Sequence, residues 1–252
     1  MTKMKFKAVI APEKLKPVLA TLERNSDDAR FNVSESGIAI KSIDPANVAL
    51  TSISIPSEAC DFLLSDTGEI GLDVSKLNDM ISDAATGEPV SLELLEEEMK
   101  LKIVYGRLNW KLSLISPDSL PKEPRLPELD LPCMAEFESS EFVKIVKAAK
   151  KVEDHLRISM EDDKVTFVCK GDTDKVEATI PITELRNAKV GYGSALFSLN
   201  YLEDIAKPAT KAGYVKLEWG PDYPLRASFS LNGGDKAGVD FQYLIAPRIE
   251  TE

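Results

Sequence analysis

The sequence has little of what catalytic and metal-binding sites are built from. Its 252 residues include a single histidine, His155. With one histidine no His-rich metal site can form, and neither a Ser-His-Asp triad nor a Cys-His pair is indicated. There is no glycine-rich phosphate loop, because the one Gly-Gly pair lies in Asn232-Gly233-Gly234-Asp235, which is typical of a hairpin turn. We therefore expect no enzymatic activity, no metal and no cofactor.

Cysteine is also scarce, and its placement excludes two further kinds of site. Cys60, Cys133 and Cys169 lie far apart, with no CxxC spacing. This pattern argues against a disulfide framework and against a zinc site, so we interpret them as reduced thiols. Two acidic runs, Glu96–Glu98 and Glu161–Asp163, each lie between strand-like segments. We interpret both as solvated turns rather than as metal sites.

Long hydrophobic runs are missing as well. No apolar stretch approaches the ~20 residues that span a bilayer, and the first residues lack the apolar core of a signal peptide. With 43 % hydrophobic and 29 % charged residues, the chain has the composition of a globular protein. A cytoplasmic protein without a membrane partner is therefore expected. The net charge of −11 taken alone argues against nucleic-acid binding, but a sum hides how charge is distributed.

The chain contains an internal duplication. Three segments match later segments in order, at a constant offset of 125 residues (for Leu72 and Phe197, 197 − 72 = 125): Ile53–Pro56 with Ala178–Pro181, Gly71–Ile81 with Leu196–Ala206, and Val90–Leu94 with Val215–Trp219. Each half has the pattern of a strand, a helix, several strands, a second helix and several strands. Two short helices against many antiparallel strands, twice over, predict an α+β fold.

The joint between the two halves is rich in proline. Residues 116–132 hold five prolines, which remove backbone donors and fix φ. This composition predicts an extended linker rather than a helix or a central strand. We therefore predict an N-terminal domain at 1–117, a connector at 118–132 and a C-terminal domain at 133–252.

Positive charge gathers on predicted helix faces in this acidic chain. Lys144, Lys147 and Lys151 lie opposite the apolar stripe that Phe142, Ile145, Val146 and Ala149 form along the third helix, predicted at 140–151. Such a face suits contact with phosphates without base reading, although a merely solvated face remains the alternative. The candidate DNA-facing residues are Lys14, Lys16, Arg24, Lys76, Lys144, Lys147, Lys150, Lys151, Lys207 and Lys211.

Three segments carry a resemblance to a known family: Ser36–Asp44, Leu129–Pro132 and Leu244–Glu250. Together with the duplication, they make the chain similar to the proliferating cell nuclear antigen (PCNA) family of archaea and eukaryotes over essentially its whole length. The resemblance implies a DNA-clamp fold and a homotrimeric ring that encircles double-stranded DNA without sequence preference. It implies a processivity factor and docking platform for DNA polymerase, flap endonuclease and ligase, loaded by a clamp loader and associated with the nucleoid.

The resemblance also implies a pocket for short client motifs, in which glutamine and a hydrophobic residue are followed by two aromatics. Its lining is carried over to Ile43, Leu50, Leu129, Leu131, Pro132, Pro224, Leu244, Ala246 and Pro247. The alternative is that the linker leucines only pin the linker to a sheet. One departure from the family is visible, because Glu13, Glu23, Asp79 and Asp83 lie on the N-terminal helices. We therefore expect the basic lining to be biased toward the C-terminal half.

Ring closure needs strand edges that two neighbouring copies can pair. We predict residues 107–115 as one edge and 174–180 as the other, with interface residues Arg107, Lys111, Asp174, Glu177 and Thr179. Three other interpretations stay open at this point: a subunit of a heterotrimeric clamp, an enzyme on an unrelated α+β scaffold, and a peptide-binding module without a DNA role.

Overall fold

The computed structural model describes residues 4–233 and 236–249, so part of the predicted turn at 232–235 lies outside the described residues. The chain forms two compact units. Unit 1 comprises Met1–Asn47, Thr51–Arg125 and Asn232–Phe241, and unit 2 comprises Val48–Leu50, Leu126–Leu231 and Gln242–Glu252. The linear division into 1–117, 118–132 and 133–252 stays a prediction.

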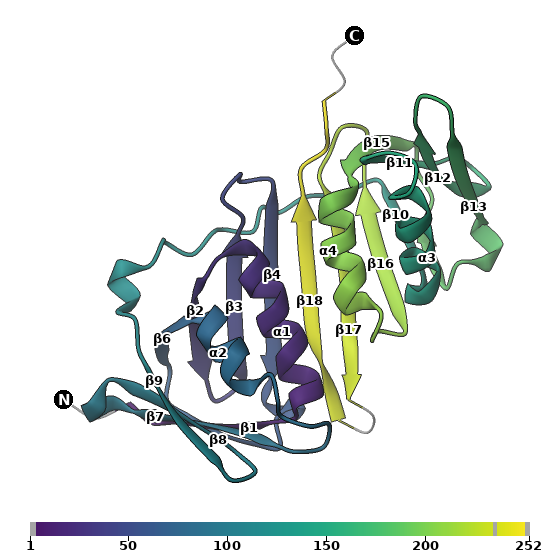
Figure 1. The fold of residues 1–252 in the computed structure, drawn as a ribbon. Helices are drawn as coiled ribbons and strands as arrows, with labels where there is room; N and C mark the ends of the chain where they lie inside the picture. The colour runs from purple at the N-terminus through teal and green to yellow at the C-terminus, as the bar shows by residue number, and fades with distance from the viewer. Residues whose placement is uncertain (1–3, 234–235, 250–252) are drawn as a thin grey trace. The chain divides into compact units, whose positions relative to one another are not determined.

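Unit 1 is built from two antiparallel sheets and two helices (Figure 1). In chain order its elements are β1 (Phe6–Ile10), α1 (Pro12–Asn25), β2 (Asp28–Ser34), β3 (Gly37–Ile43), β4 (Ala49–Pro56), β5 (Phe62–Ser65), β6 (Gly68–Asp73), α2 (Val74–Ile81), β7 (Val90–Leu95), β8 (Lys100–Tyr105) and β9 (Leu108–Ser113). One sheet has the order β5-β1-β7-β8-β9, and β4-β3-β2-β6 are neighbours in the other. One face of α1 is apolar and buried, with Leu15, Val18, Leu19 and Leu22 at most 1 % exposed.

Unit 2 repeats this construction. Its elements are β10 (Cys133–Glu138), α3 (Ser139–Ala149), β11 (His155–Met160), β12 (Lys164–Lys170), β13 (Lys175–Pro181), β14 (Asn187–Lys189), β15 (Gly193–Ser198), α4 (Leu199–Ala209), β16 (Tyr214–Trp219), most of β17 (Leu225–Gly233) and the end of β18 (Lys236–Ile245), whose residues up to Phe241 are counted in unit 1. The strand orders are β14-β10-β16-β17-β18 and β13-β12-β11-β15. Strand β18 is also a neighbour of β4, and next to them the Ala246 N–H donates to the Val48 carbonyl at 2.9 Å.

The two halves correspond element by element. The strands of the order β5-β1-β7-β8-β9 correspond, position by position, to those of β14-β10-β16-β17-β18. The strands of β4-β3-β2-β6 correspond in the same way to those of β13-β12-β11-β15. Alternating burial along strands such as β11, with every second residue in the core, explains why the apolar pattern alone marked them. The predicted duplication and α+β class are confirmed.

Helix ends differ from the predictions by a few residues. The third helix, predicted at 140–151, runs from Ser139 to Ala149. Lys211 consequently lies beyond the end of α4 at Ala209. None of the helices within residues 4–233 and 236–249 is long and apolar enough to cross a bilayer.

Candidate functional site

A lysine-lined hollow lies between α3 and α4 of unit 2. It has a volume of about 380 Å³ and an apolar floor that includes Val143, Val146 and Ala206. Lys147, Lys150, Lys151 and Lys207 also line it. They meet there because residues three and four apart share a helix face. Lys147 and Lys151 are exposed and have no side-chain partner among the described residues. The structure thus brings together four of the predicted DNA-facing lysines.

The other lysines in and around this hollow differ in whether a side chain of the same subunit already pairs with them. Lys150 Nζ donates to Oδ1 of Asp154 and to Oδ1 of Asn200, both at 2.7 Å. The hydrogen bond to Asp154 lowers the pKa of that carboxyl group. Lys207 Nζ lies 3.5 Å from the Glu203 carboxylate. Lys144 is exposed but belongs to a different hollow, described below. Free positive charge in the hollow therefore comes mainly from Lys147 and Lys151.

The N-terminal helices use their lysines internally, which corrects one prediction. Lys14 is only 7 % exposed, and its Nζ donates to the Ala59 carbonyl at 2.8 Å. It was predicted to face DNA, but a buried and bonded ammonium cannot reach phosphate. Lys16 Nζ donates to the carbonyls of Ser82 and Ala84, which follow α2, at 2.6 and 2.7 Å. Such bonds satisfy the carbonyls left free at a helix C-terminus.

The remaining predicted cations of unit 1 are exposed. Asp73 caps the N-terminus of α2 by accepting from the Lys76 N–H at 2.8 Å, and its other oxygen pairs with Lys76 Nζ at 2.7 Å. The hydrogen bond from Lys76 to Asp73 raises the pKa of Lys76. Arg24 is exposed in the last turn of α1. Because Lys14 and Lys16 are bonded to carbonyls, fewer of the predicted DNA-facing cations are available in unit 1 than in unit 2.

Strands β9 and β13 lie at the edges of their sheets, where the interface residues were predicted. Arg107, Asp174 and Thr179 are exposed. Lys111 already pairs with Glu98 at 2.7 Å within the chain, and Glu177 pairs with Lys175. Their predicted pairing across an interface would have to compete with these contacts.

Sequence reasoning missed the apolar part of both edges. Leu108 and Trp110 of β9 are 45 % and 40 % exposed, although they alternate with polar neighbours as core residues do. Beside β13, Ile145 and Ala148 of α3 and Val176 and Ala178 of β13 line a hollow of about 180 Å³. The signal was present in the sequence, because apolar alternation on a strand that ends a sheet leaves its face without a partner.

The predicted client-pocket residues lie mainly in unit 2. Leu50, Leu131 and Leu244 are 7 %, 4 % and 9 % exposed, so they are packed into the unit. Leu129, Pro132, Pro224, Ala246 and Pro247 are half-buried, and Ile43, in unit 1, is half-buried at the end of β3. For Leu131 the burial agrees with the alternative that it pins the linker.

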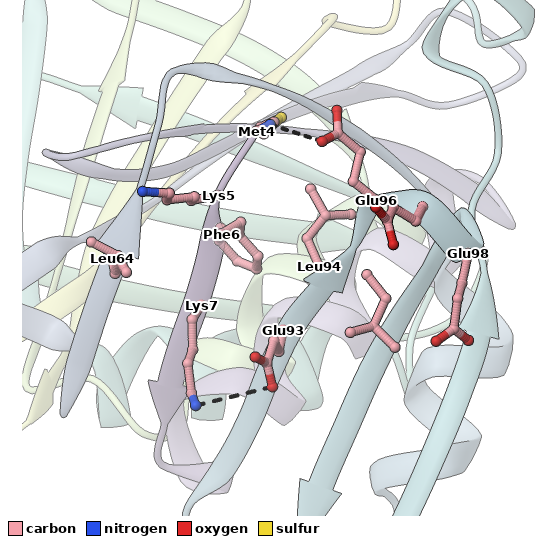
Figure 2. Close-up of a pocket in the computed structure, with 11 residues that line it drawn as sticks. Met4, Lys5, Phe6, Lys7, Leu64, Glu93, Leu94, Glu96 and Glu98 are labelled. Atoms are coloured by element: carbon pink, nitrogen blue, oxygen red, sulfur yellow. Dashed lines mark hydrogen bonds and ion pairs between the residues drawn. The ribbon is translucent and has the colours of Figure 1, made fainter. Parts of the chain in front are cut away.

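Another hollow, which was not predicted, lies at β1 and β7 of unit 1 (Figure 2). It has a volume of about 420 Å³, with Phe6, Leu64 and Leu94 among its apolar residues and glutamates at one side. The carboxylates are partly engaged: Glu96 accepts from the Met4 N–H at 2.9 Å, and Glu93 lies 4.0 Å from Lys7 Nζ. In the described ranges no group of three acidic, histidine or cysteine side chains could hold a metal ion.

All three cysteines are buried and free. Burial raises the pKa of the Cys133 and Cys169 thiols. Cys169 Sγ also donates to the Ala149 carbonyl at 3.3 Å.

Comparison with known proteins identifies relatives along the whole chain. Residues 3–111 match the family model for the N-terminal domain of proliferating cell nuclear antigen, and residues 125–248 match the model for its C-terminal domain. A DNA polymerase sliding clamp of Methanothrix thermoacetophila is 46 % identical, covering 98 % of this chain and 100 % of its own, and one of Methanococcoides burtonii is 39 % identical with the same coverage.

The fold is shared with solved structures. A solved structure described as the C-terminal region of FEN-1 bound to A. fulgidus PCNA superposes with a TM-score of 0.91 at 31 % identity, covering 98 % of this chain and 100 % of its own. The PCNA of Thermococcus kodakaraensis superposes with a TM-score of 0.86 at 25 % identity, covering 96 % of this chain and 100 % of its own. On this combination of duplicated domains, sequence identity and fold, the chain belongs to the proliferating cell nuclear antigen family of DNA sliding clamps.

Proposed function

We propose that this chain is the subunit of a homotrimeric ring that encircles duplex DNA and carries replication and repair proteins. The observation that carries the proposal is the duplication of the sheets. Strand β18 pairs with β4, and by correspondence β9 is the equivalent of β18, while β13 is the equivalent of β4. The edge strands β9 and β13 are thus copies of two strands that already pair. Pairing β9 of one copy with β13 of the next repeats that joint and leaves neither edge open.

The side chains at the two edges support this joint. Leu108 and Trp110 on β9 are exposed apolar residues, and β13 borders a hollow lined by Ile145, Val176 and Ala178. Inserting the first set into the second would remove both from water, at about 25 cal/mol per Å² of apolar surface. The contributions of Arg107, Lys111, Asp174, Glu177 and Thr179 are secondary, because exposed ion pairs contribute only about 0–1 kcal/mol each.

DNA contact is assigned chiefly to unit 2. Lys147 and Lys151 stand free at the α3–α4 hollow, whereas Lys14 and Lys16 are bonded to main-chain carbonyls. Flexible lysines without a fixed partner suit phosphates of any sequence. The overall charge of −11 would repel DNA from the other surfaces and favours threading through a ring.

Client docking is assigned to the predicted pocket residues around the connector, with the half-buried Leu129 among its apolar members. The support is the relative from A. fulgidus, which is described as bound to the C-terminal region of FEN-1. We extend this to DNA polymerase, the clamp loader and ligase, and to association with the nucleoid. The clamp itself is proposed to have no catalytic activity.

The experiment is the mass of the purified chain in solution, followed by a processivity assay. Light scattering at micromolar concentration should give three times the subunit mass of 27.7 kDa. A cognate polymerase with its clamp loader should then extend a primed circle for longer with the clamp than without it. A monomer or dimer would indicate a subunit of a heterotrimer, and a trimer without stimulation would contradict the processivity role.

A further inference from the structure

The connector is held in place by side chains rather than by a backbone ladder. In the described part of the chain no backbone-to-backbone hydrogen bond involves residues 121–131. Their polar contacts come from cations on neighbouring strands instead. Lys41 Nζ lies 3.0 Å from Glu123, and two further cations reach residues 129–131. The position of this segment therefore depends on a small number of identifiable bonds.

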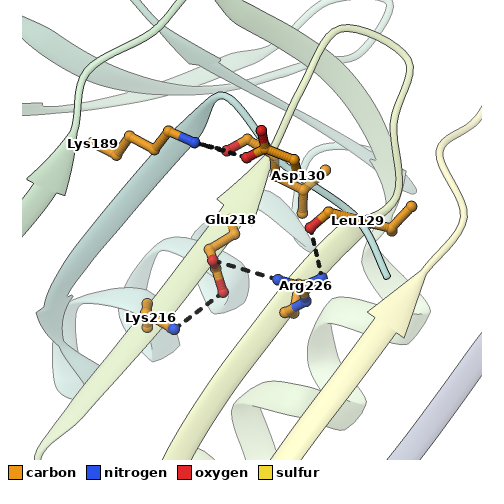
Figure 3. A network of polar contacts seen from close by, with 7 residues as sticks. Leu129, Asp130, Lys189, Lys216, Glu218 and Arg226 are labelled. Atoms are coloured by element: carbon orange, nitrogen blue, oxygen red, sulfur yellow. Dashed lines mark hydrogen bonds and ion pairs between the residues drawn. The ribbon is translucent and has the colours of Figure 1, made fainter. Parts of the chain in front are cut away.

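Arg226 makes the first of these bonds (Figure 3). Its Nη2 donates to the Leu129 carbonyl at 3.1 Å, while its Nη1 lies 3.5 Å from Oε1 of Glu218. Glu218 of β16 is the register partner of Arg226 on β17, and its second oxygen lies 3.2 Å from Lys216 Nζ. The Arg226 and Glu218 side chains are only 20 % and 18 % exposed. The guanidinium is thus oriented by one strand and presented to the connector.

Lys189 of β14 makes the next bonds. Its Nζ donates to Oδ1 of Asp130 and to the Leu131 carbonyl, both at 3.0 Å. Three consecutive connector residues, 129–131, are therefore each bonded to a cation of unit 2. Leu131 is buried below this line of bonds, and Pro132 is packed so tightly that a Cβ on Gly191 would lie 2.5 Å from its carbonyl oxygen.

We propose that Arg226 is a positioning residue for client docking: by holding the Leu129 carbonyl, it sets where the Leu129 side chain stands for a bound peptide. This inference rests on the proposed docking function. Arginine suits this place better than lysine. Its planar guanidinium can face Glu218 and the Leu129 carbonyl at the same time, whereas the lysine ammonium is a point charge on a flexible stem. Lys189 assists from the other side of Asp130.

Unit 1 contains a similar arginine that bonds the residue just before the connector. Arg30 Nη1 donates to Glu69 at 2.8 Å, and Arg30 Nη2 donates to the Pro117 carbonyl at 2.7 Å. In both arginines Nε is buried without a hydrogen-bond partner. Arg30 holds the residue just before the connector, far from Leu129 in sequence, so it offers a control with the same chemistry and similar burial.

The test compares Arg226→Met with Arg30→Met, because methionine keeps an apolar stem and removes the donors. A synthetic peptide carrying glutamine, a hydrophobic residue and two aromatics is titrated by calorimetry. Arg226→Met should weaken its binding about tenfold, the value of one charge-assisted hydrogen bond, and Arg226→Lys should recover part of the loss. Arg30→Met should leave the affinity within about twofold. Combined with Leu129→Ala, Arg226→Met should add no further loss, since it acts through Leu129.

Limited proteolysis keeps the proposal testable whatever the peptide does. Trypsin should cleave after the exposed Arg125 faster in Arg226→Met than in the wild type, because the following residues are no longer held, while the rest of the subunit stays resistant. If the wild-type ring binds the peptide and Arg226→Met binds equally well, the positioning role is wrong. If the wild-type ring binds no peptide, the docking proposal fails, and an unchanged rate of cleavage after Arg125 would then overturn the positioning role as well. Should Arg226→Met not fold, Lys189→Met at an exposed position gives the same measurements.

Discussion

Lys14 and Ala59 are joined by a buried hydrogen bond, in which the lysine Nζ donates to the carbonyl oxygen at 2.8 Å. The bond turns a predicted DNA contact into a structural one. Lys14→Ala should lower the free energy of unfolding by about 1–3 kcal/mol, because it leaves a buried carbonyl without a donor. Urea denaturation measures this. DNA retention by the variant should equal that of the wild type, and a loss of retention at full stability would return Lys14 to the DNA surface.

The ring joint predicts an effect confined to one edge of a sheet. Trp110→Glu should convert the trimer to monomers at micromolar concentration, since a charge would be buried between copies. The subunit should stay folded, because Trp110 is 40 % exposed within it. Light scattering and circular dichroism report the two effects.

Phe62→Glu is the control for that change. Phe62 is 47 % exposed on β5, at the opposite edge of the same sheet as β9. The variant should remain a trimer. If it dissociates as readily as Trp110→Glu, general loss of solubility or stability explains both results. On the partner edge, Thr179→Pro should also split the ring, since proline removes a ladder donor.

The free lysines of α3 predict a salt-dependent interaction with DNA. Changing Lys147 and Lys151 to Glu should shorten retention on nicked circular DNA most strongly at low salt. Each lost phosphate contact should reduce the slope of log affinity against log salt by ~1. The charge-matched control is Lys122→Glu with Lys170→Glu, two exposed lysines outside the helices. Equal salt dependence in the two double variants would mean that the α3 face is only solvated.

Burial separates the roles of two connector leucines. Leu131 is 4 % exposed, so Leu131→Ala should lower the free energy of unfolding by about 2–5 kcal/mol, as is usual for truncating a core leucine. Leu129 is half-buried, and Leu129→Ala should weaken client-peptide binding with little loss of stability. Calorimetry and thermal unfolding on both variants measure the separation. A stable Leu131→Ala protein with impaired binding would reverse the assignment.

The fold could be predicted from the sequence because its signals are local and repeated. Alternation marked the strands, the stripe at Phe142, Ile145, Val146 and Ala149 marked α3, and the offset of 125 residues fixed the duplication. Each of these signals depends only on spacing along the chain. The family resemblance then supplied the assembly, which no single-chain pattern contains.

The candidate sites were less predictable, because they depend on where long side chains end. Helical periodicity placed Lys14 beside Lys16 on the flank of α1, but it could not show that the two would reach carbonyls of residues 59 and 82. Nor could it show that Arg226, an ordinary outward residue of β17, would reach the connector. Contacts between residues about 50 to 100 positions apart leave no mark in local spacing.

Because Cys60, Cys133 and Cys169 are buried, the folded subunit should react only slowly with thiol reagents. Reaction requires the thiolate, and for Cys133 and Cys169 burial disfavours that form as well as blocking access. A cysteine introduced at an exposed site would therefore be the one thiol that a maleimide dye labels. Dyes placed on β9 and on β13 would report energy transfer across the proposed joint between copies, so its formation and separation can be timed without first removing any native cysteine.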